Sequence, residues 1–320
     1  MTAMHAGGVL HLSKHHGAGN DFLVVLDPDD RRPLSAAEAR ALCDRHRGIG
    51  ADGVIRVVRV ADAGPGAGTG PSAGAPGPVL SMDLRNADGG VAEMSGNGIR
   101  CMVQAAVDAG LVAPGPVQVL TLGGPRTVDY EAGPGAGEGR ARVGMGPAVL
   151  GPELATDRPG VRWARQVDMG NPHVVLFGTP VGDDVVAAVG PRLEQSVAGG
   201  ANVEFVWPGP RPGELTMRVW ERGVGETLAC GTGACAAAAA AHRHGEVGPR
   251  VRVHSPGGVL DVDVGGDEVA LAGPTQKVGD VTVDAEALAR LVAALHAPSR
   301  RVAGTPAAPA DAATEVAARP

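Results

Sequence analysis

The feature that most constrains this 320-residue chain is an internal repeat of two short glycine-containing segments. A Gly-Asn pair leads into an apolar stretch at residues 19–25 (GNDFLVV) and again at 170–176 (GNPHVVL). A Gly-rich turn precedes a run of small residues at 95–98 (SGNG) and again at 230–233 (CGTG). The two segments recur in the same order, at offsets of 151 and 135 residues. Such a duplication predicts two similar domains with one site between them.

Composition narrows the class of protein. The length suggests about two domains, and the low aromatic content of 2% predicts a core of Val, Leu, Ile and Ala. The formal net charge of −7 disfavours a nucleic-acid-binding protein, which usually has a basic face. No secretory signal, membrane-spanning segment or C-x-x-C pair is recognised. We therefore expect a cytoplasmic protein with reduced thiols and without a membrane or nucleic-acid partner.

Short β-branched segments bounded by Gly or Pro predict strands at residues 21–27, 53–60, 79–85, 116–122, 172–177, 203–207 and 215–220, and several more between 250 and 273. Helices are predicted at 35–46, where Ser35 and Glu38 form a capping box, at 284–297 after Asp284, and after each Gly-rich turn. Residues 61–78 predict a flexible loop and residues 298–320 a disordered tail.

The two Gly-rich turns are the segments of the sequence that most clearly indicate a functional site. A helix N-terminus presents unpaired N–H groups and a partial positive charge, and glycine lets a ligand approach the backbone closely. The pair of turns therefore predicts a cradle for a carboxylate or a phosphate. At such a position the Cys230 thiol is expected to have a pKa below its usual value of about 8.5. The alternative interpretation is that Ser95 is only a helix cap and Cys230 only a small buried residue.

Two reactive side chains on two facing helix ends suit stereochemical inversion at an amino-acid α-carbon. One group removes the proton from one face of the carbon and the other returns a proton to the opposite face. The α-carboxylate, held by the helix ends, takes up the negative charge that develops. Polar residues gather near the repeated segments and strengthen this hypothesis: Asn86, His173, Glu221 and Arg222.

The chain resembles the diaminopimelate epimerase family. The matching stretches are HHGAGNDFLVV (15–25), RHRGIGADGVI (45–55), RNADGGVAEMSGNGIRC (85–101), MGNPHVVLF (169–177), NVEFV (202–206) and WERGVGETLACGTGACA (220–236). The resemblance implies an α+β fold of two pseudo-symmetric domains, each a curved sheet around a central helix. It also implies that the last helix packs on the first half. The expected halves are residues 1–140 with 275–297, and residues 141–274.

The resemblance also implies roles for individual residues. Cys230 and Ser95 occupy the two acid/base positions, and His173 and Glu221 assist proton transfer around the α-amino group. The α-carboxylate is expected at Gly96, Asn97, Gly231 and Thr232. The rest of the substrate is expected at Asn20, Asn86, Asn171, Asn202 and Arg222. The implied reaction converts LL-2,6-diaminopimelate to the meso form, in lysine and peptidoglycan biosynthesis, without pyridoxal phosphate or another cofactor. Relatives in this family are often dimers, so a homodimer is left open.

One departure from the family pattern concerns the reaction itself, because the family has a cysteine where this chain has Ser95. A hydroxyl is a far weaker acid than a thiol, so it suits proton donation better than proton removal. Three hypotheses follow. The first is an epimerase that uses Cys230 and Ser95. The second is a dehydratase of the same superfamily or a racemase of another amino acid. The third is a carboxylate-binding homologue without activity. No metal site is predicted, because His242 and His244 stand two residues apart at a helix end.

Overall fold

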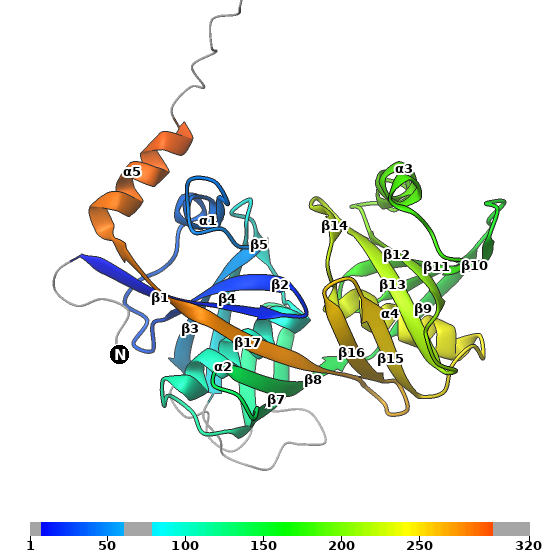
Figure 1. Ribbon diagram of the computed structural model, residues 1–320, viewed down its shortest axis with the longest axis horizontal. Helices are drawn as coiled ribbons and strands as arrows, with labels where there is room; N and C mark the ends of the chain where they lie inside the picture. The colour runs from blue at the N-terminus through cyan, green and yellow to red at the C-terminus, as the bar shows by residue number, and fades with distance from the viewer. Residues whose placement is uncertain (1–7, 61–78, 297–320) are drawn as a thin grey trace, which may run out of the picture.

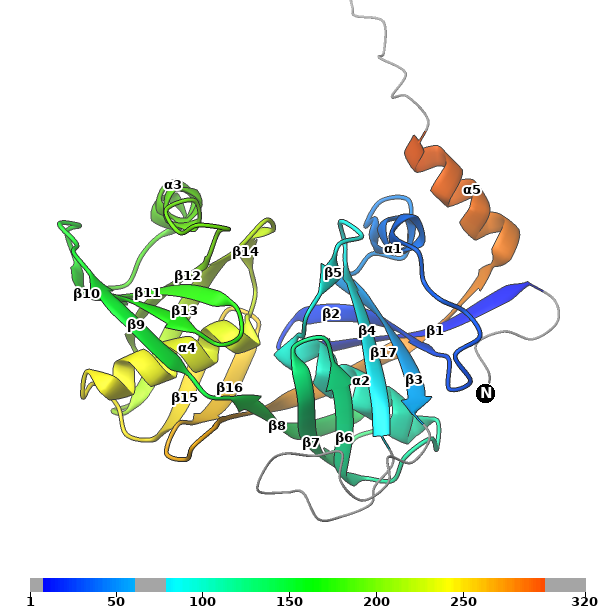
Figure 2. The ribbon, with the colours of Figure 1, turned by 180° about the vertical axis from the view of Figure 1, so that it is seen from behind.

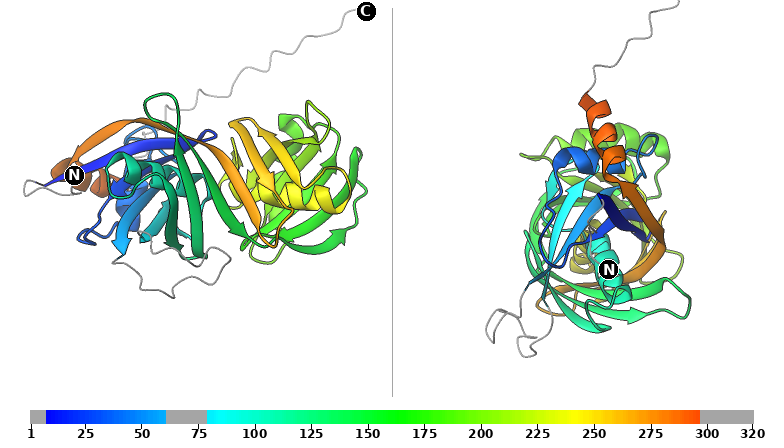
Figure 3. Two further views of the ribbon diagram at one scale, coloured as in Figure 1. Left: turned by 90° about the horizontal axis from the view of Figure 1, so that it is seen from below. Right: turned by 90° about the vertical axis from the view of Figure 1, so that its left-hand side faces the viewer.

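Two lobes of similar build lie side by side along the long axis of the molecule, each a sheet wrapped around one helix (Figures 1 and 3). The computed structural model describes residues 8–60 and 79–296. The loop predicted at 61–78 and the tail predicted at 298–320 lie outside the described residues. The α+β architecture with two curved sheets around central helices is confirmed.

The first lobe is a closed barrel of eight strands. Successive strands pair around the ring, and the last pairs with the first. The strands are β1 (Val9–Gly17), β2 (Asn20–Leu26), β3 (Gly53–Val60), β4 (Val79–Asn86), β6 (Gly115–Thr121), β7 (Gly124–Ala132), β8 (Glu138–Gly146) and β17 (Val269–Asp284). The short β5 (Val91–Ala92) extends from β4 as a hairpin arm. Helix α2 (Gly96–Asp108) runs through the barrel (Figure 2).

The second lobe repeats this order of strands around helix α4 (Gly231–Arg243). Its strands are β9 (Val149–Leu154), β10 (Val161–Asp168), β11 (Pro172–Gly178), β12 (Asn202–Pro208), β13 (Glu214–Glu221), β15 (Arg250–Ser255) and β16 (Gly258–Asp263). The parallel pairs β11–β12 and β13–β15 correspond to β2–β3 and β4–β6 of the first lobe. The arm β14 (Gly225–Thr227) corresponds to β5.

Two strands join the lobes. Strand β17 pairs with β16 of the second lobe near its start and with β1 of the first lobe near its end. Strand β8 pairs with β17 and then leads into β9. The predicted domain boundaries at 140/141 and 274/275 therefore fall inside continuous strands, and backbone hydrogen bonding runs through from one lobe to the other.

Each sheet buries nearly the whole of the helix that it surrounds. In α2, every residue from Gly96 to Ala106 is buried. In α4, every residue from Gly233 to Ala241 is buried, and most of these are alanine. A helix surrounded by strands on all sides is buried around its whole circumference, so its polar side chains need partners inside the protein, as Arg100 and Gln104 of α2 have. The alanine run is therefore a packing feature of the second lobe.

Most predicted elements are confirmed. Ser35 and Glu38 form the capping box of α1 (Ala36–Cys43), which ends three residues before the prediction. Asp284 accepts hydrogen bonds from the N–H groups of residues 286 and 287 at the start of α5 (Ala285–His296). Helix α3 (Asp183–Glu194) was not predicted, because it contains Pro191 and begins without a side-chain cap.

Helix α5 packs on the first lobe. It follows β17 and lies beside α1 (Figure 1). Leu288 is 3% exposed and belongs to an apolar cluster with Leu34 and Leu42. Among residues 8–60 and 79–296, no helix is long and apolar enough to cross a membrane.

We expect Leu288→Ala to lower the free energy of unfolding by about 2–3 kcal/mol, because it removes a buried side chain and leaves a cavity. Unfolding in urea, followed by circular dichroism, measures this. Val278→Ala is the matched control, since Val278 is 60% exposed on the neighbouring strand β17, and it should change stability by less than about 0.5 kcal/mol. Equal effects of the two changes would show that α5 is not anchored as described.

Candidate active site

The N-terminal ends of α2 and α4 meet at the junction of the two lobes. A Cβ atom placed on Gly231 would lie 3.2 Å from the Cα atom of Gly96, and one on Gly96 would lie 3.5 Å from the Cα atom of Gly231. The Leu271 side chain of β17 lies against both positions, at 3.0 and 2.9 Å from those Cβ sites. Glycine is thus needed for the close approach of the two backbones. The unpaired N–H groups of both helices converge on one place.

Ser95 and Cys230 are the N-cap residues of these two helices. The Ser95 hydroxyl accepts a hydrogen bond from the Gly98 N–H at 3.1 Å, so the capping interpretation of this residue is correct as far as it goes. Cys230 makes no side-chain cap bond, and its Sγ lies 3.4 Å from the Thr232 hydroxyl. Both residues stand at the ends of arms with the same spacing, nine residues after Asn86 and Glu221 respectively.

A buried polar group surrounds the Cys230 side of the site. His173 Nδ1 lies 2.7 Å from Glu204 Oε1, and both side chains are fully buried. His173 Nε2 lies 3.0 Å from Asn171 Oδ1, and the Asn171 amide donates to the Thr232 hydroxyl at 3.4 Å. These contacts link the helix end that carries Cys230 to a carboxylate in the core of the second lobe.

Glu204 was not predicted as a site residue. The segment 203–207 reads as an ordinary apolar strand, and Glu204 is its one charged member. The signal that could have found it is this charge in the middle of an otherwise buried strand, since unpaired carboxylates are almost never fully buried. Its Oε2 atom has no hydrogen-bond partner among the described residues.

The Ser95 side of the site is apolar at the corresponding places. A Cβ atom on Gly98 would meet the side chains of Ile55 and Phe22, whereas a Cβ atom on Gly233 would meet Glu204. In the repeat, Phe22 occupies the position of His173. The internal symmetry of the backbone is therefore not a symmetry of charge, and ionisable groups gather beside the thiol.

The prediction of a lowered pKa for Cys230 was wrong. Burial raises the pKa of the Cys230 thiol well above its ordinary value, and the Glu221 and Glu204 carboxylates raise it further. The Thr232 hydroxyl and a backbone N–H act in the opposite direction with less effect. The helix end cannot outweigh burial and two negative charges, so the ligand-free protein holds Cys230 as a protonated thiol. Burial likewise raises the pKa of Glu221, which accepts a hydrogen bond from Thr227.

Asn20 and Asn97 connect the first lobe to the helix ends. The Asn97 amide donates to Asn20 Oδ1 and to the Ala229 carbonyl of the second lobe, both at 3.3 Å. The Asn20 amide donates in turn to Asp52 Oδ2 at 2.6 Å. These hydrogen bonds connect the two lobes through the Asn97 side chain and fix the orientation of both amides.

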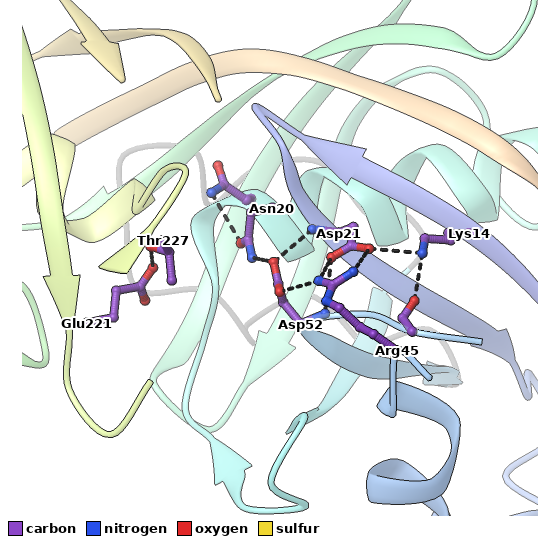
Figure 4. Close-up of polar contacts among 9 residues, drawn as sticks. Lys14, Asn20, Asp21, Arg45, Asp52, Glu221 and Thr227 are labelled. Atoms are coloured by element: carbon purple, nitrogen blue, oxygen red, sulfur yellow. Dashed lines mark hydrogen bonds and ion pairs between the residues drawn. The ribbon is translucent and has the colours of Figure 1, made fainter. Parts of the chain in front are cut away.

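Charged residues hold Asp52 in place. Figure 4 shows them together with Glu221 and Thr227 of the second lobe. Arg45 binds both Asp52 and Asp21 at 2.7 Å, and Lys14 lies 3.0 Å from Asp21. None of Lys14, Arg45 and Asp52 was predicted as part of the site. They act through Asn20, because the Arg45–Asp52 pair fixes the direction of the Asn20 amide.

The remaining predicted site residues are Asn86, Asn202 and Arg222. Asn86 ends β4 and pairs with Gly53 in β3. Asn202 pairs with His173 between β12 and β11, and its Oδ1 accepts the backbone N–H of Arg222 at 2.9 Å. The exposed Arg222 guanidinium donates to the Gly199 carbonyl at 3.4 Å, so here it contacts its own lobe. In the part of the chain that the structure describes, no cluster of three or more His, Cys, Asp or Glu side chains could hold a metal ion.

Sequence comparison identifies relatives of this chain. A family model described as diaminopimelate epimerase matches residues 12–151 and 165–278. The diaminopimelate epimerase of Thermobifida fusca is 41% identical over 280 residues, covering 86% of this chain and 99% of the relative. That of Streptomyces coelicolor is 41% identical over 284 residues, covering 85% and 94%.

Solved structures share the fold. A hydroxyproline epimerase from Agrobacterium vitis, with bound trans-4-hydroxy-L-proline, matches with a TM-score of 0.65 and 16% identity, over 88% of this chain and 94% of that chain. A phenazine biosynthesis protein of the PhzF family from Bacillus anthracis matches with a TM-score of 0.58 and 13% identity, over 86% and 99%. At these identities the matches concern the fold alone.

We expect Glu221→Gln to lower the pKa of Cys230, because it removes one of the negative charges that disfavour the thiolate. Each unit of pKa changes the thiolate fraction about tenfold, so alkylation of Cys230 by iodoacetamide at pH 8 should become at least severalfold faster. Mass spectrometry of the Cys230 peptide between pH 7 and 10 measures this. Glu131→Gln, on an exposed part of β7, is the control and should leave the rate unchanged. A slower reaction in Glu221→Gln would contradict the assignment.

Proposed function

The chain belongs to the diaminopimelate epimerase family, and from this premise we propose that it interconverts the LL and meso forms of 2,6-diaminopimelate at the α-carbon. The observation that carries the proposal is the contact of the two helix ends at Gly96 and Gly231, with a thiol on one helix and a hydroxyl on the other. An amino acid held there has a proton donor or acceptor available on each face.

The helix ends bind the α-carboxylate in this proposal. The N–H groups of Gly96, Asn97, Gly231 and Thr232 belong to the first turns of their helices, where no intrahelical acceptor exists. A carboxylate at this place receives hydrogen bonds from both lobes. As the Cα–H bond breaks, negative charge moves onto the carboxylate oxygens, and the same N–H groups stabilise it more strongly than in the ground state.

Proton transfer involves Cys230 and Ser95 on opposite faces. The Cys230 thiol, protonated in the free protein, donates its proton to the planar carbanion or, once ionised, removes the proton from the α-carbon. The Ser95 hydroxyl supplies the proton on the other side, and in the reverse direction its alkoxide receives one. Each complete inversion breaks one C–H bond and forms another, so the net proton count is unchanged and two side chains are sufficient without a cofactor.

The Ser95 hydroxyl makes the two directions unequal. A hydroxyl is several pKa units less acidic than a thiol, and each unit corresponds to about 1.4 kcal/mol. Donation of its proton to a carbanion is favourable, whereas formation of a free alkoxide to remove a Cα proton is costly. The step in which Ser95 gives up its proton to the carbanion is therefore easier than the step in which it removes a Cα proton.

The other polar residues position the substrate. We propose that His173 and Glu221 contact the α-amino group, since both lie on the Cys230 side of the helix ends. Asn20, Asn86, Asn171, Asn202 and Arg222 bind the distal part of the molecule. In this assignment the exposed Arg222 guanidinium leaves the Gly199 carbonyl and turns to the distal carboxylate.

The product of this reaction serves lysine and peptidoglycan biosynthesis. We further propose that the protein works in the cytoplasm, in agreement with its four cysteines, all of which are free thiols. A homodimer is proposed from the family resemblance, and light scattering coupled to size-exclusion chromatography tests it.

Incubation with LL-2,6-diaminopimelate in deuterated water tests the proposed activity. An epimerase yields meso-diaminopimelate with deuterium at the inverted α-carbon. A dehydratase yields a keto acid, and a racemase of another amino acid leaves diaminopimelate unchanged but inverts its own substrate. A binding protein yields no product and no exchange. Proton NMR and chiral chromatography separate these outcomes.

We expect Cys230→Ala to lower the rate of meso-diaminopimelate formation by at least about a thousandfold, since removal of an essential proton-transferring group typically costs this much or more. The assay above measures it. Cys235→Ala is the matched control, because Cys235 lies buried in the same helix, and it should retain most of the activity. A wild-type rate for Cys230→Ala would sink the assignment of the thiol.

We expect Ser95→Cys to raise kcat at least about tenfold, because a thiol replaces a hydroxyl several pKa units weaker as an acid. Ser95→Ala, which removes the proton donor on that face, should fall well below the wild type. Loss of the N-cap bond should cost both variants up to about 1 kcal/mol of stability. If Ser95→Cys abolishes activity while the protein stays folded, Ser95 serves a different reaction.

A further inference from the structure

Among the residues that the structure describes, Arg100 is the largest fully buried side chain, and it lies directly behind the helix ends. It stands one helical turn after Gly96 in α2, and its Nη1 donates to the Gly96 carbonyl at 2.7 Å. Its Nη2 donates to Asn97 Oδ1 at 2.8 Å, and its Nε donates to the Pro274 carbonyl of β17 at 3.3 Å. The guanidinium is held from three directions.

None of these partners is charged. Among residues 8–60 and 79–296, no carboxylate forms an ion pair with the Arg100 guanidinium. Arg56, also largely buried, shows the contrast, because it is paired with three aspartates, Asp27, Asp30 and Asp83. Burial lowers the pKa of Arg100 to about 10, so the side chain remains a cation at neutral pH.

The fold makes room for this cation at the cost of stability. A Cβ atom on Gly17 would lie 2.9 Å from Arg100 Nη2, and one on Gly273 would lie 3.1 Å from it. Two strands thus have no side chain where the guanidinium lies. A buried charge without a counter-ion is unfavourable by several kcal/mol, even when its hydrogen bonds are satisfied. An anion that binds nearby would remove much of this penalty.

The charge is present on one side of the site only. The position of Arg100 in the repeat is taken by Cys235 in α4, a neutral buried thiol. The second lobe has carboxylates, Glu204 and Glu221, where the first has apolar or amide side chains. A buried cation therefore lies behind the end of α2, and buried carboxylates lie near Cys230.

We propose that Arg100 is a positioning residue of the reaction: it is the buried counter-charge that favours an anion at the end of α2, and it fixes the Asn97 side chain that links the two lobes. The anion is the α-carboxylate of the substrate, and this identification rests on the proposed function. Arg100 acts through the helix end and through Asn97. With Asn97 Oδ1 held by the guanidinium, the Asn97 amide N–H₂ group is directed to Asn20 and Ala229.

The first test compares two ligands that differ in their carboxylates. Binding of meso-diaminopimelate and of 1,5-diaminopentane, which has the same amines and no carboxylate, is measured by calorimetry and NMR titration. Arg100→Met should weaken diaminopimelate binding at least tenfold, about 1.4 kcal/mol, and should change diaminopentane binding less than about twofold. Arg126→Met is the control, since Arg126 lies in β7 of the same lobe and bonds only backbone carbonyls, and it should leave both unchanged.

The second test needs no ligand. A nearby cation stabilises a thiolate, so the thiol introduced by Ser95→Cys should ionise at higher pH once Arg100 is replaced. Alkylation by iodoacetamide is followed against pH by mass spectrometry, in Ser95→Cys alone and combined with Arg100→Met. The midpoint of the alkylation profile should shift to higher pH by at least about half a unit when Arg100→Met is added to Ser95→Cys. Adding Arg126→Met to Ser95→Cys should leave the midpoint unchanged.

The results separate the two proposals. If the wild type binds no diaminopimelate, the proposed function is wrong. The pH profile of alkylation in Ser95→Cys then still tests the counter-charge role of Arg100. Equal weakening of both ligands, or an unchanged thiol profile, would overturn the counter-charge role. Arg100→Lys keeps the charge and should stay within about threefold of the wild-type affinity. Arg100→Lys replaces Arg100→Met in both tests if Arg100→Met does not fold. A tenfold or greater loss of diaminopimelate affinity in the folded Arg100→Lys variant would show that the shape of the side chain, and not its charge, is required.

Discussion

The contact between the two helix N-termini is the constraint on which the rest of the structure depends. Two helices can meet end to end at backbone distance only if both begin with glycine and a sheet surrounds each of them from behind. Strand β17 runs through both lobes and pairs with β8, and its Leu271 side chain lies against both glycines, so it holds the two helix ends in register. The proposed active site is thus made by the junction of the lobes, and neither lobe contains it alone.

The duplicated backbone carries unequal charges. Beside Cys230 lie the His173–Glu204 pair and Glu221, and burial with these carboxylates keeps the thiol protonated. Behind Ser95 lie apolar side chains and the unpaired Arg100. The unequal surroundings therefore change how easily the groups on the two faces of the substrate give up a proton. A serine on the positive side then remains usable as a donor, since negative charge left there is stabilised.

Local patterns predicted much of the fold. The strands 53–60 and 203–207, the capping box of Ser35 and the helices after the Gly-rich turns all follow from short-range rules, because β-branched runs, caps and glycine turns act over a few residues. The sixteen residues of β17 were predicted only in part. Its polar second half pairs with β1 from the other end of the chain, and such long-range pairing leaves no local signal.

The sequence by itself determined that two equivalent glycine-rich helix starts exist, that one bears a thiol and the other a hydroxyl, and that the chain resembles one family. These facts are properties of residue identity and spacing. Only the tertiary structure decided the electrostatics. In the sequence, Glu204 is a single charged residue in a predicted strand and Arg100 is one charged residue in a predicted helix. Packing buries both side chains, and it leaves Glu204 beside the Cys230 thiol and Arg100 without a counter-ion. The prediction of a lowered pKa for Cys230 was wrong for the same reason, because desolvation and the distance to other charges are set by residues far apart in the chain.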